Sequence, residues 1–375
     1  MGVDANLFPM SFSAFQGNAA TVRSAREMLS RERFPHAVIL SGPRGSGKFT
    51  LAQMIAKAMN CLEPPITDDG LPDYCGHCSN CERIAQADDL DARIAEAVEA
   101  REAMRDTDKK ETRILIQTHP DVLILPPDPP QLLVKVDQVR HLIGHIYYRP
   151  SQGEHKVYIF SEANFMKEAA NSLLKVLEEP PEFATIFLLS ENPSSLLATI
   201  RSRCVQLRLE AIAPEDVETY LAKEHPDWAP RQRALVARLS GGGIGKARSF
   251  DLAAYTAARQ DALTLLRSSV STQDHTELFK VTEGYRAGAD GKDKTDQLIR
   301  ASYSLLQDLL YLLSGTPKLV RNTDLASELN KFVGSIDLEW LQRASQKLGE
   351  VETGMRRNLL RSLSLDAYAT SLERN

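Results

Sequence analysis

The sequence predicts an α/β domain with a parallel sheet over residues 1–209, followed by helices alone up to Asn375. Three observations predict this fold class. The apolar run Ala37–Leu40 leads through a glycine-rich turn into a helix-forming stretch, which gives the order strand, loop, helix. Further short apolar runs alternate with helical stretches, which is typical of a parallel sheet covered on both faces. Almost no strand candidate follows Pro214.

Composition and charge restrict the classes of protein that the chain can belong to. A length of 375 residues suggests two to three domains, and 43% hydrophobic with 25% charged residues is ordinary for a globular protein. A net charge of −5 argues against a surface that binds nucleic acid by itself. There is no apolar run of about 18 residues, and the N-terminus lacks the basic and apolar segments of a secretory signal. Asn6 replaces the Ser or Thr of a lipidation site, so we expect a cytoplasmic protein.

The glycine-rich turn has the features of a phosphate-binding loop. Gly42, Gly45 and Gly47 allow consecutive backbone N–H groups to turn towards one anion at the start of the next helix. Lys48 adds a point charge for the outer phosphates of a nucleotide. These residues therefore predict a P-loop fold, whose loop could hold the phosphates of ATP.

Two residues that would hold the magnesium ion of such a site are missing. The loop pattern requires a hydroxyl directly after the lysine, but Phe49 is there, and Thr50 lies about 100° further around the helix. The predicted strand Lys156–Phe160 ends in Ser161, where a P-loop NTPase has a metal-binding aspartate, and in Glu162, which keeps the water-activating position. The loop is then either inherited architecture or an active site that uses Thr50 and Glu162.

Four cysteines are spaced as ligands of a structural metal ion. Cys75, Cys78 and Cys81 follow one another at two-residue intervals, and Cys61 can complete the set. Four thiolates favour tetrahedral Zn²⁺ and leave no open position for catalysis. His77 could compete as a ligand, but it lies inside the turn and is expected to face solvent. The alternative for the whole group is buried thiols without a metal.

The remaining elements follow from apolar periodicity and from breaks at proline and glycine. Segment 85–113 is strongly charged, with apolar residues at roughly helical intervals, so it predicts a solvated helix or helical hairpin, or a surface that binds a partner. Leu305–Leu313 is apolar enough to be core. The expected helices are Ala19–Ser30, one that begins at Val136, Ala169–Glu179, Ser194–Ile200 and Pro214–Leu221, and the expected strands are Val122–Leu125, Lys156–Phe160, Thr185–Leu189 and Val205–Leu209.

Taken together, six stretches of the chain resemble the AAA+ subunits of bacterial clamp loaders, and they occur in the order of that family. The stretches are SGPRGSGK (41–48), the cysteines at 61, 75, 78 and 81, THPDV (118–122), NSLLKVLEEPP (171–181), LLATIRSRC (196–204) and GGGIGKA (241–247). The resemblance implies an AAA+ P-loop domain over 1–209, with a zinc module at 61–81 and the charged insertion 85–113. It also implies a helical lid over 210–256 and a helical collar for oligomerisation over 257–375.

The resemblance further implies partners and roles for single residues. Such subunits form a ring of five with gamma/tau and delta types, which uses ATP and Mg²⁺ to load a sliding clamp on primer–template DNA. Arg203 of the SRC stretch would reach in trans into the neighbour's ATP site, where a guanidinium neutralises developing charge. The alternative for Arg203 is an ion pair within the chain. Lys246 falls where the lid of the family often directs an arginine to bound nucleotide.

Three functions remain in view. The first is a stator that hydrolyses no ATP and completes the neighbour's site through Arg203, which the losses at Phe49 and Ser161 favour. The second is an active ATPase of the gamma/tau type. The third is a stand-alone zinc-binding P-loop protein unrelated to replication, and the LEEPP and SRC stretches argue against it.

Overall fold

The computed structural model describes residues 11–31, 34–129, 131–270, 274–286, 291–355 and 360–373. Residues 1–10, on which the expectations about export and lipidation rest, lie outside the described residues. The chain divides into two compact units, which are described separately. The first unit contains Met1–Ala213 and Gly242–Lys246, and the second contains Pro214–Gly241 and Ala247–Asn375.

The first unit is built on a six-stranded sheet with the strand order β2-β3-β4-β5-β1-β6. All neighbouring strands pair in parallel except β2, which runs antiparallel to β3 at one edge. The predicted parallel sheet is therefore confirmed, with an edge strand that the prediction lacks. The strands are β1 (Ala37–Ser41), β2 (Ile116–His119), β3 (Val122–Leu125), β4 (Lys156–Phe160), β5 (Ala184–Ser190) and β6 (Val205–Arg208).

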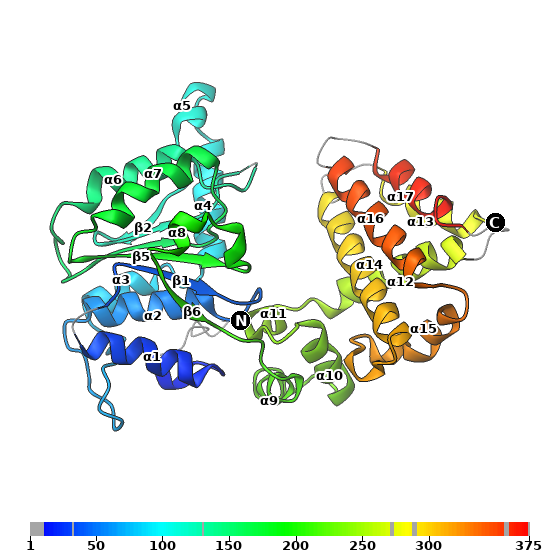
Figure 1. The fold of residues 1–375 in the computed structure, drawn as a ribbon, viewed down its shortest axis with the longest axis horizontal. Coiled ribbons are helices and arrows are strands. Elements are labelled where there is room, and N and C mark those ends of the chain that lie inside the picture. Colours follow the sequence, from blue (N-terminus) through cyan, green and yellow to red (C-terminus); the bar gives the residue numbers. More distant parts are fainter. Residues whose placement is uncertain are drawn as a thin grey trace. The chain divides into compact units, whose positions relative to one another are not determined.

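Helices cover both faces of this sheet, as Figure 1 shows. Val38 and Leu40 of β1 pack under the helices of one face, while Ala37 and Ile39 pack under those of the other. This alternation arises because successive side chains of a strand point to opposite faces. The first face carries α1 (Ala19–Ser30), α2 (Lys48–Asn60) and α3 (Ser79–Ala85), and the second carries α6 (Val136–Ile146), α7 (Lys167–Glu178) and α8 (Ala198–Arg201).

Short 3-10 turns complete the first unit. The helix predicted over Ser194–Ile200 is wrong as a single element, because a 3-10 turn, η2 (Pro193–Ser195), precedes α8. Leu196 adopts extended backbone between the two pieces and so interrupts the helix. A second 3-10 turn, η1 (Phe12–Ala14), precedes α1.

The charged insertion 85–113 forms two helices, α4 (Leu90–Glu102) and α5 (Asp106–Glu111). Helices form within this segment, as expected, but α4 is not solvated on all sides, because Leu90, Ile94 and Val98 pack against the core of the first unit.

A buried ion pair fastens α4 to the rest of the domain. The Arg101 guanidinium donates to the Asp128 carboxylate at 2.9 Å, and the side chain of Asp128 is 1% exposed. Asp128 also accepts from the backbone N–H of Ile114 at 3.1 Å and lies 3.2 Å from the Lys135 ammonium. One carboxylate thus joins the insertion to two other segments.

We expect Asp128→Ala to destabilise the protein by about 3–5 kcal/mol, because it leaves the buried Arg101 charge and the Ile114 N–H without their acceptor. Urea unfolding followed by circular dichroism measures this change. Glu99→Ala on the exposed side of α4 is the matched control and should stay within about 0.5 kcal/mol of wild type. Equal stability of the two variants would show that the ion pair does not hold the insertion.

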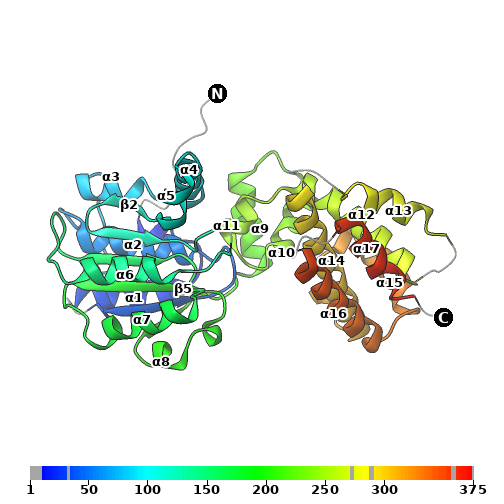
Figure 2. The ribbon, with the colours of Figure 1, turned by 90° about the horizontal axis from the view of Figure 1, so that it is seen from above.

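The second unit is helical throughout its described residues, as predicted, and Figure 2 shows its helices from above. Its core contains Trp340, Leu305 and Leu309, while Leu310 is 41% exposed, so Leu305–Leu313 is core along one side only. No helix among the described residues has both the length and the apolar character needed to cross a membrane. The helices are α9 (Pro214–Glu224), α10 (Pro230–Leu239), α12 (Leu252–Val270), α13 (Thr276–Glu283), α14 (Gly291–Leu313), α15 (Ala326–Val333), α16 (Leu338–Met355) and α17 (Arg361–Thr370), with 3-10 turns η3 (Pro317–Leu319) and η4 (Thr323–Leu325). The short helix α11 (Ile244–Arg248) begins in the first unit and ends in the second.

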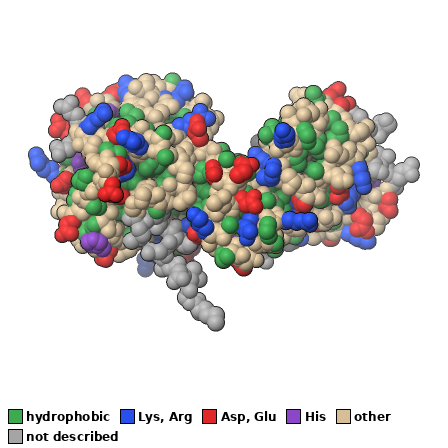
Figure 3. All heavy atoms as spheres, turned by 90° about the horizontal axis from the view of Figure 1, so that it is seen from below, with side chains coloured by type: hydrophobic (Ala, Val, Ile, Leu, Met, Phe, Trp, Pro, Cys, Tyr) green, Lys and Arg blue, Asp and Glu red, His purple; other side chains and the backbone are tan. Residues whose placement is uncertain are grey.

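Charged side chains of both signs are interspersed on the face drawn in Figure 3. No large basic field covers this face, which agrees with the net charge of −5.

Candidate functional site

The predicted phosphate loop lies between β1, which ends at Ser41, and α2, which begins at Lys48. Gly45 and Gly47 have φ values of 76° and 88°, a left-handed backbone that favours glycine. A Cβ atom at Gly42 would lie 2.4 Å from the carbonyl oxygen of Leu209, so this position has no room for a side chain. Backbone conformation and lack of space therefore favour glycine at these positions, whether or not the loop binds phosphate.

Lys48 is held by its own loop. Its ammonium donates to the carbonyl oxygens of Gly42 at 2.8 Å and Pro43 at 2.7 Å. Burial lowers the pKa of Lys48, and the charges of Glu191 and Glu162 oppose this shift. A phosphate group would have to draw the ammonium away from both carbonyls.

The segment Gly242–Lys246 packs directly against the phosphate loop and belongs to the same unit. The N–H of Gly245 donates to the carbonyl oxygen of Gly45 at 2.9 Å. A Cβ atom at Gly243 would lie 2.3 Å from the Arg44 carbonyl oxygen. The fold thus brings Lys246 beside the loop, as the resemblance implies.

An aromatic ring covers the other side of the loop. A Cβ atom at Gly47 would lie 2.8 Å from Cζ of Phe15, which follows η1. The hydroxyl of Ser46 is buried and forms no hydrogen bond within the described part of the chain. The loop is thus covered from two directions by other parts of the same unit.

The residues around the expected magnesium position lack the required oxygens. Phe49 packs its ring against the apolar core, and Thr50 is half-buried one residue later on α2. Ser161 follows β4, and its N–H donates to the Leu125 carbonyl oxygen at 3.3 Å. Glu162 is exposed. The two departures seen in the sequence thus lie at the start of α2 and directly after β4, in the same unit.

The four predicted cysteines lie together in a cluster that could hold a metal ion. The sulfur atoms of Cys61, Cys75, Cys78 and Cys81 are all within 4.8 Å of one another. Backbone N–H groups support them, since Cys75 N donates to Cys61 Sγ and Cys78 N to Cys75 Sγ, both at 3.3 Å. His77 is exposed and is not part of the cluster, as expected. A single tetrahedral ion fits this set of ligands.

Two buried polar side chains attach the cysteine module, and no motif or spacing in the sequence predicts either contact. Arg26 of α1, 7% exposed, donates to the Asp69 carboxylate at 2.7 Å and to the Leu71 carbonyl oxygen at 3.0 Å. Asp73 accepts from the Phe12 N–H at 3.2 Å. These contacts fix the module against the helix and turn that precede β1.

Arg203 forms an ion pair within the chain, which is the alternative to its predicted role in trans. Its NH2 group lies 2.7 Å from Glu178 Oε1, and its NH1 group donates to the Thr199 carbonyl oxygen at 2.9 Å. The Arg203 side chain is still 35% exposed, so the pair does not remove the guanidinium from solvent. Glu178 lies in the LEEPP stretch, and the pair thus joins two of the motifs quoted above.

The HPD residues of the THPDV stretch have a structural role in this fold. The Asp121 carboxylate accepts from the N–H groups of Ser151, Gln152 and Gly153, each at 2.8 Å. Burial works against ionisation, but these three donors lower the pKa of Asp121. His119 is fully buried and accepts the Asp121 N–H at 3.1 Å. This motif therefore holds the connection between α6 and β4.

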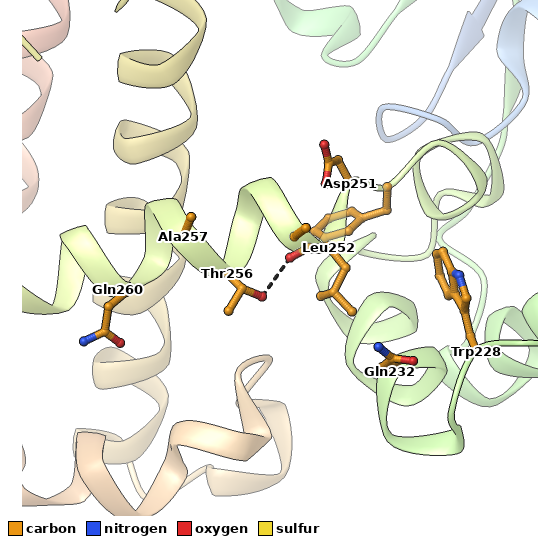
Figure 4. Close-up of a pocket in the computed structure, with 9 residues that line it drawn as sticks. Trp228, Gln232, Asp251, Leu252, Thr256, Ala257 and Gln260 are labelled. Carbon is orange, nitrogen blue, oxygen red and sulfur yellow. Dashed lines mark hydrogen bonds between the residues drawn. The ribbon is translucent and has the colours of Figure 1, made fainter. Parts of the chain in front are cut away.

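A separate open groove of about 850 Å³ lies within the second unit (Figure 4). Trp228 and Gln232 line it from the start of α10, and residues around the start of α12 line it from the other side. At that start, Thr256 Oγ1 donates to the Leu252 carbonyl oxygen at 2.7 Å. None of the predicted site residues lines this groove.

The fold and the loop define a class of protein. A parallel sheet, a glycine-rich loop after a central strand and a lysine at the start of the following helix are the features of a P-loop nucleotide-binding domain. A family model described as "DNA polymerase III, delta subunit" matches residues 17–213 of this chain. The chain belongs to this family.

Curated relatives agree with this assignment. The DNA polymerase III subunit tau of Escherichia coli is 30% identical over 281 residues, which cover 73% of this chain and 38% of the relative. The DNA polymerase III subunit delta′ of Pseudomonas aeruginosa is 32% identical over 213 residues, which cover 56% of this chain and 54% of the relative. The chain thus spans about half the length, or less, of these two relatives.

The solved structures that resemble this chain are only distantly similar to it. A gamma subunit-related protein of DNA polymerase III from Thermotoga maritima is 20% identical and covers 67% of this chain and 82% of its own, with a TM-score of 0.38. A score this low carries no argument about function. The family assignment rests on the sequence match.

Proposed function

We propose that this chain is a delta-prime-type stator of the DNA polymerase III clamp loader. In this proposal the chain binds in a ring with gamma/tau-type and delta-type subunits, and the ring loads a sliding clamp on primer–template DNA. The chain hydrolyses no ATP at its own loop. Instead, Arg203 acts on the ATP of a neighbouring subunit.

The position of Phe49 is the observation that carries the stator role. Its half-buried ring packs against the apolar core, at the sequence position where a P-loop enzyme has the hydroxyl that binds Mg²⁺. Ser161 removes the second expected ligand, and Lys48 is bonded to the carbonyl oxygens of its own loop. All three features weaken the same nucleotide site, which favours a stator over a motor subunit.

Partial exposure supports the role of Arg203. A side chain that acts across a subunit boundary must be reachable from outside, and 35% of the Arg203 side chain is exposed. Its planar fork can donate to a phosphate bidentately, which a lysine cannot do. Glu162, in contrast, has no partner aspartate, so a catalytic role for it at this chain's own loop is the weaker proposal.

We propose Zn²⁺ as the ion of the cysteine cluster. Four thiolate sulfurs are the ligand set that zinc prefers in closed structural sites, and Cys81 is almost completely buried. When bound, the ion would crosslink the segment after α2 to the start of α3. The proposed role is structural, because four protein ligands leave no position for a substrate.

We expect the isolated full-length chain to show negligible ATP hydrolysis with Mg²⁺ and primed DNA, because the two metal-binding oxygens are missing. A coupled phosphate-release assay measures this, with Lys48→Ala as the control that separates true turnover from a contaminating ATPase. Robust turnover that Lys48→Ala abolishes would favour the alternative, an active gamma/tau-type subunit that uses Thr50 and Glu162.

A further inference from the structure

We propose that Glu178 is a positioning residue for Arg203: its carboxylate holds the guanidinium in the orientation from which it reaches the neighbouring subunit's nucleotide. This inference rests on the proposed role of Arg203 in trans. The proposed function gives the LEEPP stretch, which contains Glu178, no role, and this inference assigns one to it.

Two contacts hold the guanidinium at two different nitrogen atoms. NH2 donates to Glu178 Oε1 at 2.7 Å, and NH1 donates to the Thr199 carbonyl oxygen at 2.9 Å. Because the guanidinium is planar, two fixed nitrogens determine the direction of the whole group. An arginine has five N–H donors, so this arrangement leaves donors of the same fork for a phosphate.

The two acceptors, the Glu178 carboxylate and the Thr199 carbonyl oxygen, belong to helices that are held in place by buried apolar side chains. Glu178 is the last residue of α7, directly after the buried Val176 and Leu177, and Pro180 and Pro181 follow it. The second acceptor belongs to α8, where Ile200 is completely buried. A functional side chain is placed most precisely when its partners are themselves fixed in this way.

Because the Arg203–Glu178 pair is exposed, its effect on the orientation of Arg203 can be distinguished from its effect on the stability of the fold. The side chains of Arg203 and Glu178 are 35% and 51% exposed, so the pair lies at the surface. Ion pairs at the surface contribute little to folding because water screens them. The geometry of this pair would therefore act on the direction of Arg203, and loss of Glu178 should change turnover more than it changes stability.

The test uses the full chain assembled with gamma/tau-type and delta-type subunits of the same organism, with single-turnover ATP hydrolysis as the measurement. We expect Glu178→Ala to lower hydrolysis at the neighbouring site about two- to fivefold, the range that an exposed pair can account for. Glu178→Gln should recover most of this loss, because its amide oxygen can accept the same hydrogen bond. Melting temperature and ring assembly should not change.

A double-mutant comparison tests whether Glu178 acts through Arg203. Glu178→Ala should have no further effect in a chain that already carries Arg203→Ala. The matched control is Glu179→Ala, which removes an exposed carboxylate that forms no ion pair with the described residues. Its hydrolysis rate should equal that of wild type.

The outcomes distinguish this inference from the proposed function. If Arg203→Ala lowers hydrolysis but Glu178→Ala does not, the positioning role is wrong and the arginine finger stands. If Arg203→Ala has no effect, the finger is wrong and the positioning role falls with it. An equal loss from Glu179→Ala, or a further loss from Glu178→Ala on top of Arg203→Ala, would show that Glu178 does not act through Arg203.

Discussion

Replacing Arg203 by alanine should lower ATP hydrolysis at the neighbouring site of the assembled ring by about a thousandfold, the effect typical of an arginine finger. The guanidinium neutralises charge that develops on the transferred phosphoryl group, and the methyl group of alanine cannot do so. Arg203→Lys should recover only part of the rate, since an ammonium keeps the charge but loses the planar fork.

Single-turnover hydrolysis in the reconstituted ring measures this effect, and size-exclusion chromatography shows whether the ring still forms. Arg208→Ala is the matched control, because it removes an exposed arginine from β6 in the same unit. A ring that contains Arg203→Ala and hydrolyses ATP at the wild-type rate would remove the finger assignment. A ring that fails to assemble would instead give Arg203 a role in the interface.

Substituting Cys81 by serine should release the metal ion and strongly destabilise the first unit. Structural zinc contributes on the order of 10 kcal/mol to the folding of small zinc modules, although here part of the module is also held by Arg26 and Asp73. We expect one equivalent of zinc per wild-type chain, and less than a tenth of that in Cys81→Ser or Cys75→Ser.

Atomic emission analysis of the purified chain measures the metal content, and thermal unfolding measures the loss of stability. Cys204→Ser is the matched control, because Cys204 is the one cysteine outside the cluster, and this variant should keep its zinc. A wild-type chain that folds fully without any metal would refute the site and favour the alternative of buried thiols.

The sequence predicted the central strands well because they are continuous apolar runs between clear breaks. β4 begins and ends where expected, and β1 and β5 differ from their predictions by one or two residues. The edge strand β2 was missed because its apolar Ile116 is followed by the polar Gln117 and Thr118. A strand this short is stabilised by its pairing with β3, which no local pattern records.

The site was predictable where its residues are close in sequence. Spacing alone predicted that four of the cysteines share one site, and their sulfur atoms do lie within 4.8 Å of one another. It also predicted a glycine-rich turn between a strand and a helix, which the structure contains, and phosphate binding there stays a prediction. The partners of single polar side chains were not predictable, because they depend on tertiary contacts between distant segments. Glu178 is 25 residues from Arg203, and Asp69 is 43 residues from Arg26.

The contact between Gly245 and Gly45 has a consequence for how the molecule can be divided. The chain passes between the two units three times, after Ala213, after Gly241 and after Lys246. No single cut in the backbone therefore yields two intact halves, and a fragment that ends at Ala213 lacks the segment that packs on its phosphate loop. Nucleotide binding measured on such a fragment would report on a loop that has lost its contact with Gly242–Lys246. Binding to the native loop therefore has to be measured on the whole chain.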